Sequence, residues 1–275
     1  MKFDMGRAWN DAVALLRANR QVVLVIAGVF FFLPNLALIL LLPDYAQAMG
    51  TPGAAQPTDP DAALKALADA YGQVWWAVLI SIVAQGIGML GLLALLTDRD
   101  RPTVGEALVI GAKSFLPYIG TSILQSIVLV LVALIPFLAG GAAGIGVGVM
   151  VGIVALVVLA YLFTKFSLSI VVIVAERVMN PVSAIARSWA LTKGNSLRIF
   201  LFYVLLFIVL IVIAIVMSIV LGIIGALAGP SGVLFVSGLS NALFNMIFVA
   251  VYLAVLAAVH RQLSGSAATI GQTFE

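Results

Sequence analysis

The sequence predicts an all-α integral membrane protein with six transmembrane helices and three amphipathic surface helices on the cytoplasmic side. Hydrophobic residues make up 64% of the 275-residue chain and charged residues only 9%, whereas an ordinary soluble domain has about 25% charged residues. The mean hydropathy is +1.23. The apolar residues fall in long runs, and about 20 consecutive apolar residues cross a bilayer as a helix.

Polar or glycine-rich segments separate the apolar runs, which predict spans at about 22–42, 74–96, 118–138, 148–175, 199–227 and 233–259. These form one domain over residues 1–263, followed by a polar cytoplasmic tail at 264–275. Pro34 predicts a kink in the first span. The turns of the later spans are predicted at 139–148 and 229–232, where glycine is frequent.

The first apolar run is predicted to remain as a span. Ala46-Gln47-Ala48 resembles a signal-peptide cleavage site. However, the uncharged stretch at 21–43 is longer than the ~7–15 apolar residues of a signal peptide.

Three basic segments at about 4–20, 103–116 and 181–193 predict surface helices. Thr103 with Glu106 has the spacing of a capping box, and Pro117 is expected to separate this helix from the third span. In the last segment, Asn180-Pro181 predicts a helix start. The apolar stripe there consists of Val182, Ile185, Ala186 and Trp189.

Lysine and arginine are distributed unequally between the two sides of this six-span arrangement. Twelve fall on one side, and these are residues 2, 7, 17, 20, 99, 101, 113, 177, 187, 193, 198 and 261. Lys65 falls on the other side and Lys165 within a span. By the positive-inside rule, both termini are cytoplasmic. The sequence therefore predicts a multi-pass protein of the bacterial cytoplasmic (inner) membrane.

The basic segments are also compatible with a threefold repeat of one surface helix followed by two spans. Residues 14–19 and 190–195 share three identities, whereas the middle segment has little in common with either. The alternative is that any basic helix beside a membrane uses alanine, leucine, lysine and arginine.

The segment between the fourth and fifth spans resembles the glycerophosphodiester phosphodiesterase membrane-domain family of bacterial six-helix proteins. The matching residues are Ala184, Ser188, Trp189, Leu191, Lys193 and Gly194, with Lys165 in the preceding span where arginine is more usual. The resemblance implies a membrane module. Some relatives carry a separate catalytic barrel domain, but the longest polar segment here is 43–72. The resemblance therefore does not imply phosphodiesterase activity.

The candidate lipid or ligand residues are basic or amide side chains. Lys165 is the only charge deep in a span, and a charge at mid-bilayer costs ~2.5–3.5 kcal/mol on insertion scales. We interpret it as a snorkelling side chain whose ammonium reaches lipid phosphates, with a ligand site as the alternative. Arg17, Arg187 and Lys193 are expected near anionic head groups.

The amides Gln125, Asn241 and Asn245 lie on the third and sixth spans and share helix faces with smaller polar residues. Hydrogen bonds between helices explain them at about 0.6 kcal/mol per contact. A polar cavity between the second, third and sixth spans is the alternative. The glycines at 140, 144, 148 and 152 have the spacing of a close-packing ridge.

Catalytic and metal-binding chemistry is not indicated. The chain has no cysteine and one histidine, His260, and no carboxylate is near His260 in sequence to orient its ring. We expect no catalytic residue, metal, cofactor or nucleic-acid partner. The leading hypothesis is a non-enzymatic membrane protein that binds or organises anionic lipid or a membrane partner. A transporter or exporter of a small amphiphilic or peptide solute is the second hypothesis, and a membrane-bound enzyme the third.

Overall fold

The computed structural model describes residues 2–41, 59–98 and 102–273, and every element in these residues is a helix. Six segments of this described part are long and apolar enough to cross a membrane: Arg20–Leu40, Val74–Thr97, Val104–Ala143, Ile145–Ala175, Ser196–Leu227 and Phe235–Gly265. The prediction of six apolar spans is therefore confirmed. The predicted loop at 43–58, which includes Ala46-Gln47-Ala48, lies outside the described residues, as do Arg99 and Arg101.

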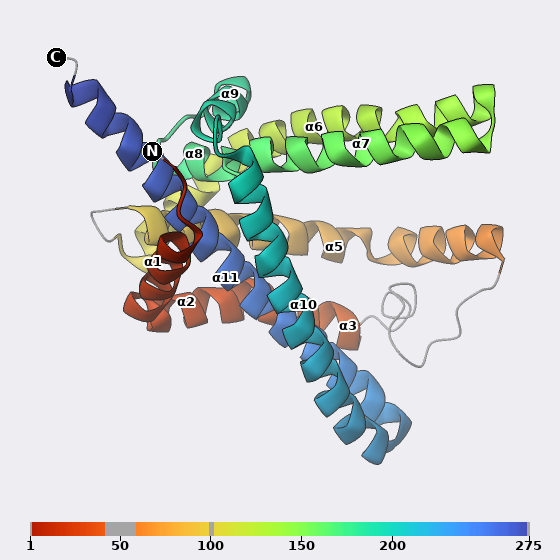
Figure 1. Ribbon diagram of the computed structural model, residues 1–275. Helices are drawn as coiled ribbons and strands as arrows, with labels where there is room; N and C mark the ends of the chain where they lie inside the picture. Colours follow the sequence, from red (N-terminus) through yellow and green to blue (C-terminus); the bar gives the residue numbers. More distant parts are fainter. Residues whose placement is uncertain (1, 42–58, 99–101, 274–275) are drawn as a thin grey trace.

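The spans are connected as follows. The chain starts with α1 (Met5–Ala18), α2 (Arg20–Ala27), the π-helix η1 (Gly28–Phe32) and α3 (Leu33–Leu41). It continues with α5 (Pro60–Thr97), α6 (Val104–Ala143), α7 (Ile145–Phe166), α8 (Ser169–Ala175), α9 (Pro181–Leu191), α10 (Ser196–Leu227) and α11 (Gly229–Thr273). The α6–α7 hairpin extends alongside α5, and the α10–α11 hairpin crosses them at an angle (Figure 1).

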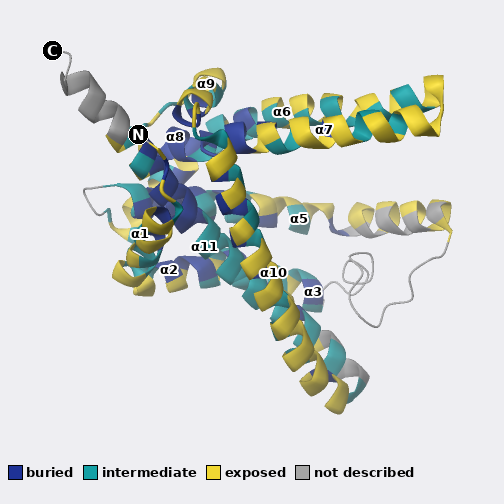
Figure 2. Ribbon diagram, viewed as in Figure 1, coloured by how far each residue is buried: buried dark blue, intermediate teal, exposed yellow. Residues whose placement is uncertain are grey.

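The hydrophobic core lies at the end of the molecule where α1, α8 and α9 meet the long helices (Figure 2). Leu92, Val172 and Val255 are fully buried there. At the opposite end, Phe137 is 78% exposed and Leu227 86% exposed. Apolar surface on this scale marks a face that contacts something other than water, in keeping with membrane-spanning hairpins. We call the first region the packed end and the second the outer end.

Local sequence signals predicted several helix boundaries correctly. Thr103 and Glu106 form the predicted capping box, and the Asn180 side chain accepts hydrogen bonds from the first turn of α9. The turns of both hairpins fall at glycines with positive φ, Gly144 (93°) and Gly229 (79°). Glycine adopts this conformation without steric cost because it has no Cβ.

The predicted glycine ridge is divided between two helices, because Gly144 is the turn itself. Gly140 of α6 instead faces Gly148 of α7, and a Cβ added at Gly148 would lie 2.8 Å from Gly140 Cα. The two backbones touch near the outer end of the hairpin, which is the packing that small residues allow in membranes.

The expectation about Pro117 was wrong. Pro117 does not separate a surface helix from the third span, because α6 is continuous from Val104 to Ala143. The carbonyl that Pro117 leaves without its N–H partner belongs to Lys113, an exposed residue. The threefold repeat thus lacks a separate middle surface helix and stays a hypothesis.

In the first span, the irregularity precedes Pro34 and takes the form of the π-helix η1. The Leu33 N–H bonds to the Gly28 carbonyl, five residues back. This wider turn accommodates a proline ring that would collide with a regular helix. At the other terminus, α11 continues to Thr273, so helix extends into the segment predicted as a tail at 264–275.

Candidate functional site

The fourth span, predicted as one helix over 148–175, is interrupted at the packed end between α7 and α8. Three successive carbonyls at the break accept serine hydroxyls: Ser167 Oγ to Thr164 O (2.8 Å), Ser188 Oγ to Lys165 O (2.6 Å) and Ser169 Oγ to Phe166 O (2.7 Å). Such side-chain bonds compete with the regular helical pattern. They connect the break to α9, since Ser188 belongs to that helix.

Lys165 is enclosed beneath α9. Only 2% of its surface is exposed, and its Nζ lies 3.5 Å from the Trp189 carbonyl oxygen. The same nitrogen lies 5.3 Å from the Trp189 ring centroid and 5.4 Å from that of Tyr161, both within cation–π range. None of the ion pairs among the described residues includes Lys165. The snorkelling interpretation is therefore wrong, because Trp189 covers the ammonium.

Four residues of the family resemblance, Ala184, Ser188, Trp189 and Leu191, contact the rest of the protein from α9. Ala184 and Ser188 are fully buried, and Leu191 is 8% exposed. The Trp189 ring packs edge-on against Tyr161, with 5.7 Å between centroids. Gly194, with φ of 82°, makes the turn into α10. Apart from the exposed Lys193, these residue types are explained by the docking of a short helix over Lys165.

Three of the four residues in the apolar stripe predicted on α9 are not covered by the rest of the protein. Val182 is 65% exposed, and Ile185 and Ala186 are also not buried, whereas Trp189 packs on Tyr161. The protein leaves this side of α9 uncovered.

Glu176 connects three elements at the packed end. Its Oε2 accepts from Arg187 Nε on α9 at 2.8 Å, and its Oε1 lies 3.0 Å from His260 Nε2 on α11. Burial by itself raises the pKa of this carboxyl, but the hydrogen bonds and charges of Arg187 and His260 outweigh burial and hold its pKa below the usual value. Glu176 is therefore ionised at neutral pH. Arg187, predicted to lie near anionic head groups, is only half exposed because of this pair.

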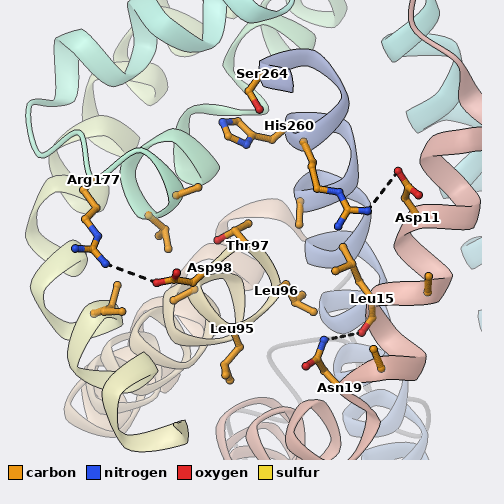
Figure 3. A pocket seen from close by; sticks show the side chains of 18 residues that line it. Asp11, Leu15, Asn19, Leu95, Leu96, Thr97, Asp98, Arg177, His260 and Ser264 are labelled. Atoms are coloured by element: carbon orange, nitrogen blue, oxygen red, sulfur yellow. Dashed lines mark hydrogen bonds and ion pairs between the residues drawn. The ribbon is translucent and has the colours of Figure 1, made fainter. Parts of the chain in front are cut away.

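The carboxylate that orients His260 is distant in sequence, in keeping with the observation that none lies near it along the chain. Glu176 supplies this carboxylate from 84 residues away, a separation that no local pattern in the sequence reveals. Ser264 lies one turn further along α11 and points toward the imidazole (Figure 3). However, the described structure has no hydrogen bond between Ser264 and His260, and a serine nucleophile requires that contact with its base.

A cavity of about 870 Å³ opens beside His260, between α1, α5, α8 and α11. Two ion pairs stand at its walls, Arg177–Asp98 and Arg261–Asp11, each with 3.6 Å between the charged atoms (Figure 3). Arg177 has a φ of 54°, a conformation that non-glycine residues adopt at an energetic cost. The volume lies within the ~300–1,000 Å³ usual for small-molecule sites.

Exposed basic side chains without a carboxylate partner are frequent at the packed end. Apart from Lys65 on α5, seven exposed lysines and arginines of the described residues have no ion pair, namely Lys2, Arg7, Arg17, Arg20, Lys113, Lys193 and Arg198. Two of the three predicted head-group residues, Arg17 and Lys193, are in this set. Their positively charged groups are available to an anionic partner.

The predicted amides are not brought together. Gln125 Nε2 donates to Ser169 Oγ of α8 at 2.7 Å, and α6 packs on α5, α7, α8 and α9 rather than on α11. Asn241 is exposed, while the side-chain oxygen Oδ1 of Asn245 is buried with no hydrogen-bond partner. The 870 Å³ cavity does not include these three residues. It is thus not the cavity expected between the second, third and sixth spans.

In the described part of the chain, no three His, Asp or Glu side chains are close enough to hold a metal ion. Comparison with protein-family models, with curated proteins and with solved structures finds no match to this chain.

Proposed function

We propose that this chain is a non-enzymatic protein of the bacterial cytoplasmic membrane that binds and organises anionic lipid at its packed end. The observation that carries this proposal is the set of seven unpaired, exposed basic side chains around that end. Juxtamembrane lysine and arginine each contribute about 1 kcal/mol of attraction to an anionic membrane surface.

The geometry supports the proposal in a second way. Arg177, Arg187 and Arg261 are paired with carboxylates, so the packed end uses some arginines for its own cohesion and leaves others without a partner. In this proposal the packed end faces the cytoplasm, with both termini on that side, as the distribution of lysine and arginine predicts. The residues of the family resemblance serve to dock α9, which keeps Lys193 at the surface.

Lipid retention by native mass spectrometry tests the proposal. The purified protein is compared with a triple variant, Arg17→Gln, Lys193→Gln and Arg198→Gln, in mixed micelles of phosphatidylglycerol and phosphatidylcholine. We expect wild type to retain phosphatidylglycerol preferentially and the triple variant to lose roughly 100-fold in preference, at ~1 kcal/mol per side chain.

Lys65→Gln is the matched control, because Lys65 lies near the start of α5, far from the packed end. Its preference should equal that of wild type. An equal preference in wild type and the triple variant, or no preference for the anionic lipid at all, contradicts the proposal.

A transporter of a small amphiphilic or peptide solute is the second candidate. It is supported by the cavity of about 870 Å³, which opens among the ends of four helices. Solute uptake into proteoliposomes tests this candidate, with empty liposomes as the control. Equal uptake by both preparations contradicts it.

A further inference from the structure

Lys165 is a buried cation without a close acceptor. Its one hydrogen-bond contact among the described residues is to the Trp189 carbonyl oxygen, and this contact is 3.5 Å long, beyond the usual ~2.7–3.2 Å of an N–H···O bond. The same carbonyl also accepts from Thr192 Oγ1 at 3.2 Å. An ammonium has three N–H donors, so most of the donors of Lys165 are unused. A buried charge is costly unless it is paired and hydrogen-bonded.

The cover over this ammonium consists of two aromatic side chains that are themselves partly exposed. Tyr161 is 46% exposed and Trp189 is 38% exposed. Their rings pack edge-on against each other, and neither side chain makes a hydrogen bond in the described structure. A rotation of the Trp189 ring would therefore open the way to the Lys165 ammonium without breaking a hydrogen bond.

The position of α9 places this cover at the edge of the membrane-spanning helices. α9 lies across α6 and α7 where these helices enter the packed end (Figure 1). Its first residue, Pro181, is close to the third span, since a Cβ added at Gly120 would lie 3.0 Å from Pro181 Cγ. Tryptophan and tyrosine collect at the head-group level of a bilayer. The Tyr161–Trp189 pair is therefore expected at the depth of the lipid phosphates.

An exposed apolar strip of α7 leads to the same point. Val154 and Val158 are exposed, and with Tyr161 and Lys165 they follow the i, i+4, i+7, i+11 spacing of one helix face. An acyl chain that lies along this strip places its head group beside Lys165.

A second cation is close to Lys165. Lys193 is exposed, and it is near enough for its charge to repel that of Lys165. No ion pair of the described residues includes either lysine. Two neighbouring ammonium groups without a carboxylate favour an anion with several acceptor oxygens, such as a phosphate group.

We propose that Lys165 and Lys193 together bind one phosphate group, which is admitted when the Trp189 ring turns aside. The proposal rests on the proposed binding of anionic lipid and adds a defined primary site to it, with one lipid per chain. A lipid head group and a phosphate from solution share this chemistry. The apolar strip of α7 favours the lipid.

Native mass spectrometry of the first bound lipid tests the site, in mixed micelles of phosphatidylglycerol and phosphatidylcholine. We expect Lys165→Gln to lower the preference for phosphatidylglycerol by about 10- to 100-fold, the range for a hydrogen bond to a charged group. Lys165→Arg, which keeps the charge and N–H donors, should keep most of the preference. Lys113→Gln removes an exposed lysine of the same end and should lose only about fivefold, as surface attraction predicts.

The outcomes separate this proposal from the proposed function. A preference that Lys165→Gln shares with wild type overturns the phosphate site and leaves anionic-lipid binding at the surface intact. Absence of any preference in wild type contradicts the proposed function itself.

Tryptophan fluorescence gives a readout that keeps Lys165 in place. Replacing Trp9, Trp75 and Trp76 by phenylalanine leaves Trp189 as the sole tryptophan, and all three replaced residues are exposed. We expect the Trp189 emission to shift in a saturable way with phosphatidylglycerol, because the phosphate replaces the ring at the ammonium. An equal shift with phosphatidylcholine, or no shift with any anion, overturns the proposal.

Inorganic phosphate, added to phosphatidylcholine micelles of the same protein, separates the two sources of the anion. A shift with phosphatidylglycerol alone assigns the site to a lipid head group. A shift with inorganic phosphate as well assigns it to phosphate groups in general.

Discussion

At the packed end, side chains from α7, α8, α9 and α11 meet through hydrogen bonds and ion pairs, whereas at the outer end α6 and α7 meet through the backbones of two glycines. Glu176 bonds to α9 and α11, and Ser188 bonds to the α7–α8 break. Gly140 and Gly148 face each other near the other tip. Neighbouring helices are therefore held together by polar side chains in one region and by close backbone packing in the other.

The difference follows from the surroundings that each region is built for. Lipid tails are as apolar as leucine, so helices in the bilayer gain little from burying leucine and instead pack closely through small residues. The polar contacts of the packed end suit a position near the head groups, where water reaches the exposed partners. The comparison therefore predicts that substitutions of charged residues reduce the stability of the protein mainly at the packed end. It also predicts that replacing a glycine by alanine costs least stability where the two contacting helices can move apart.

Replacing Glu176 should have the largest effect. Glu176→Gln leaves Arg187 and the buried His260 without their shared carboxylate, at a cost of about 2–4 kcal/mol in the free energy of unfolding. Thermal unfolding in detergent, followed by circular dichroism, measures this loss of stability. Asp69→Asn, which removes an exposed carboxylate with no ion pair, should unfold like wild type. Equal unfolding of wild type and Glu176→Gln contradicts the proposed role of Glu176 in holding the packed end together.

The same pair of proteins gives a pH dependence with a definite sign. The Glu176 pKa is lower in the folded protein than its ordinary value of 4.5. Its contribution is therefore complete above pH 4.5 and is lost as the pH falls through the folded pKa. The stability difference between wild type and Glu176→Gln should shrink below pH 4.5. A difference that grows on acidification contradicts this sign.

Glycine substitutions compare the two regions directly. A Cβ on Gly111 would lie 2.6 Å from the Ile87 carbonyl oxygen, where α6 crosses α5 in the packed end. Gly111→Ala should therefore cost about 1–3 kcal/mol of stability. Gly148→Ala also places a Cβ against backbone atoms. It should cost less stability than Gly111→Ala because the two helices can move apart at the tip of the hairpin.

The matched controls are Gly105→Ala on α6 and Gly146→Ala on α7, whose added Cβ atoms meet nothing within 4 Å. Urea titration of the four variants in one detergent ranks them. A larger loss for Gly148→Ala than for Gly111→Ala would place the tightest packing at the outer end, against the account.

Arg177→Gly should have the smallest effect and the opposite sign. Glycine removes the cost of the positive φ at this position, roughly 1–2 kcal/mol, whereas the largely exposed pair with Asp98 contributes only ~0–1 kcal/mol. We expect a slight gain in stability. Arg261→Gly, within α11, should instead lose about 0.5–1 kcal/mol. A loss at position 177 as large as that at 261 contradicts the backbone argument.

The parts of the fold that the sequence predicted correctly depend on neighbouring residues. Asn180 caps its own helix, and Gly144 and Gly229 turn where glycine is needed. Pro117 was misjudged because the effect of a missing N–H depends on the surroundings of the Lys113 carbonyl in the folded helix, which the proline itself does not indicate.

The candidate site depended on contacts between distant residues, so less of it could be predicted. Lys165 was singled out correctly as unusual, but its enclosure comes from Trp189 on a separate helix. The Glu176–His260 pair and the cavity arise only when α8, α11 and α1 meet. A single sequence without covariation contains no signal for such pairs.

The central claim is that the packed, basic end faces the cytoplasm, and reactive-cysteine labelling in intact cells tests it most directly. The chain has no native cysteine to remove. Thr58→Cys lies outside the described residues, between α3 and α5, while Ser231→Cys and Ser266→Cys lie toward opposite ends of α11. We expect Thr58→Cys and Ser231→Cys to react with an impermeant maleimide from outside, and Ser266→Cys to react only after permeabilisation. Labelling of Ser266→Cys from outside intact cells would contradict the claim.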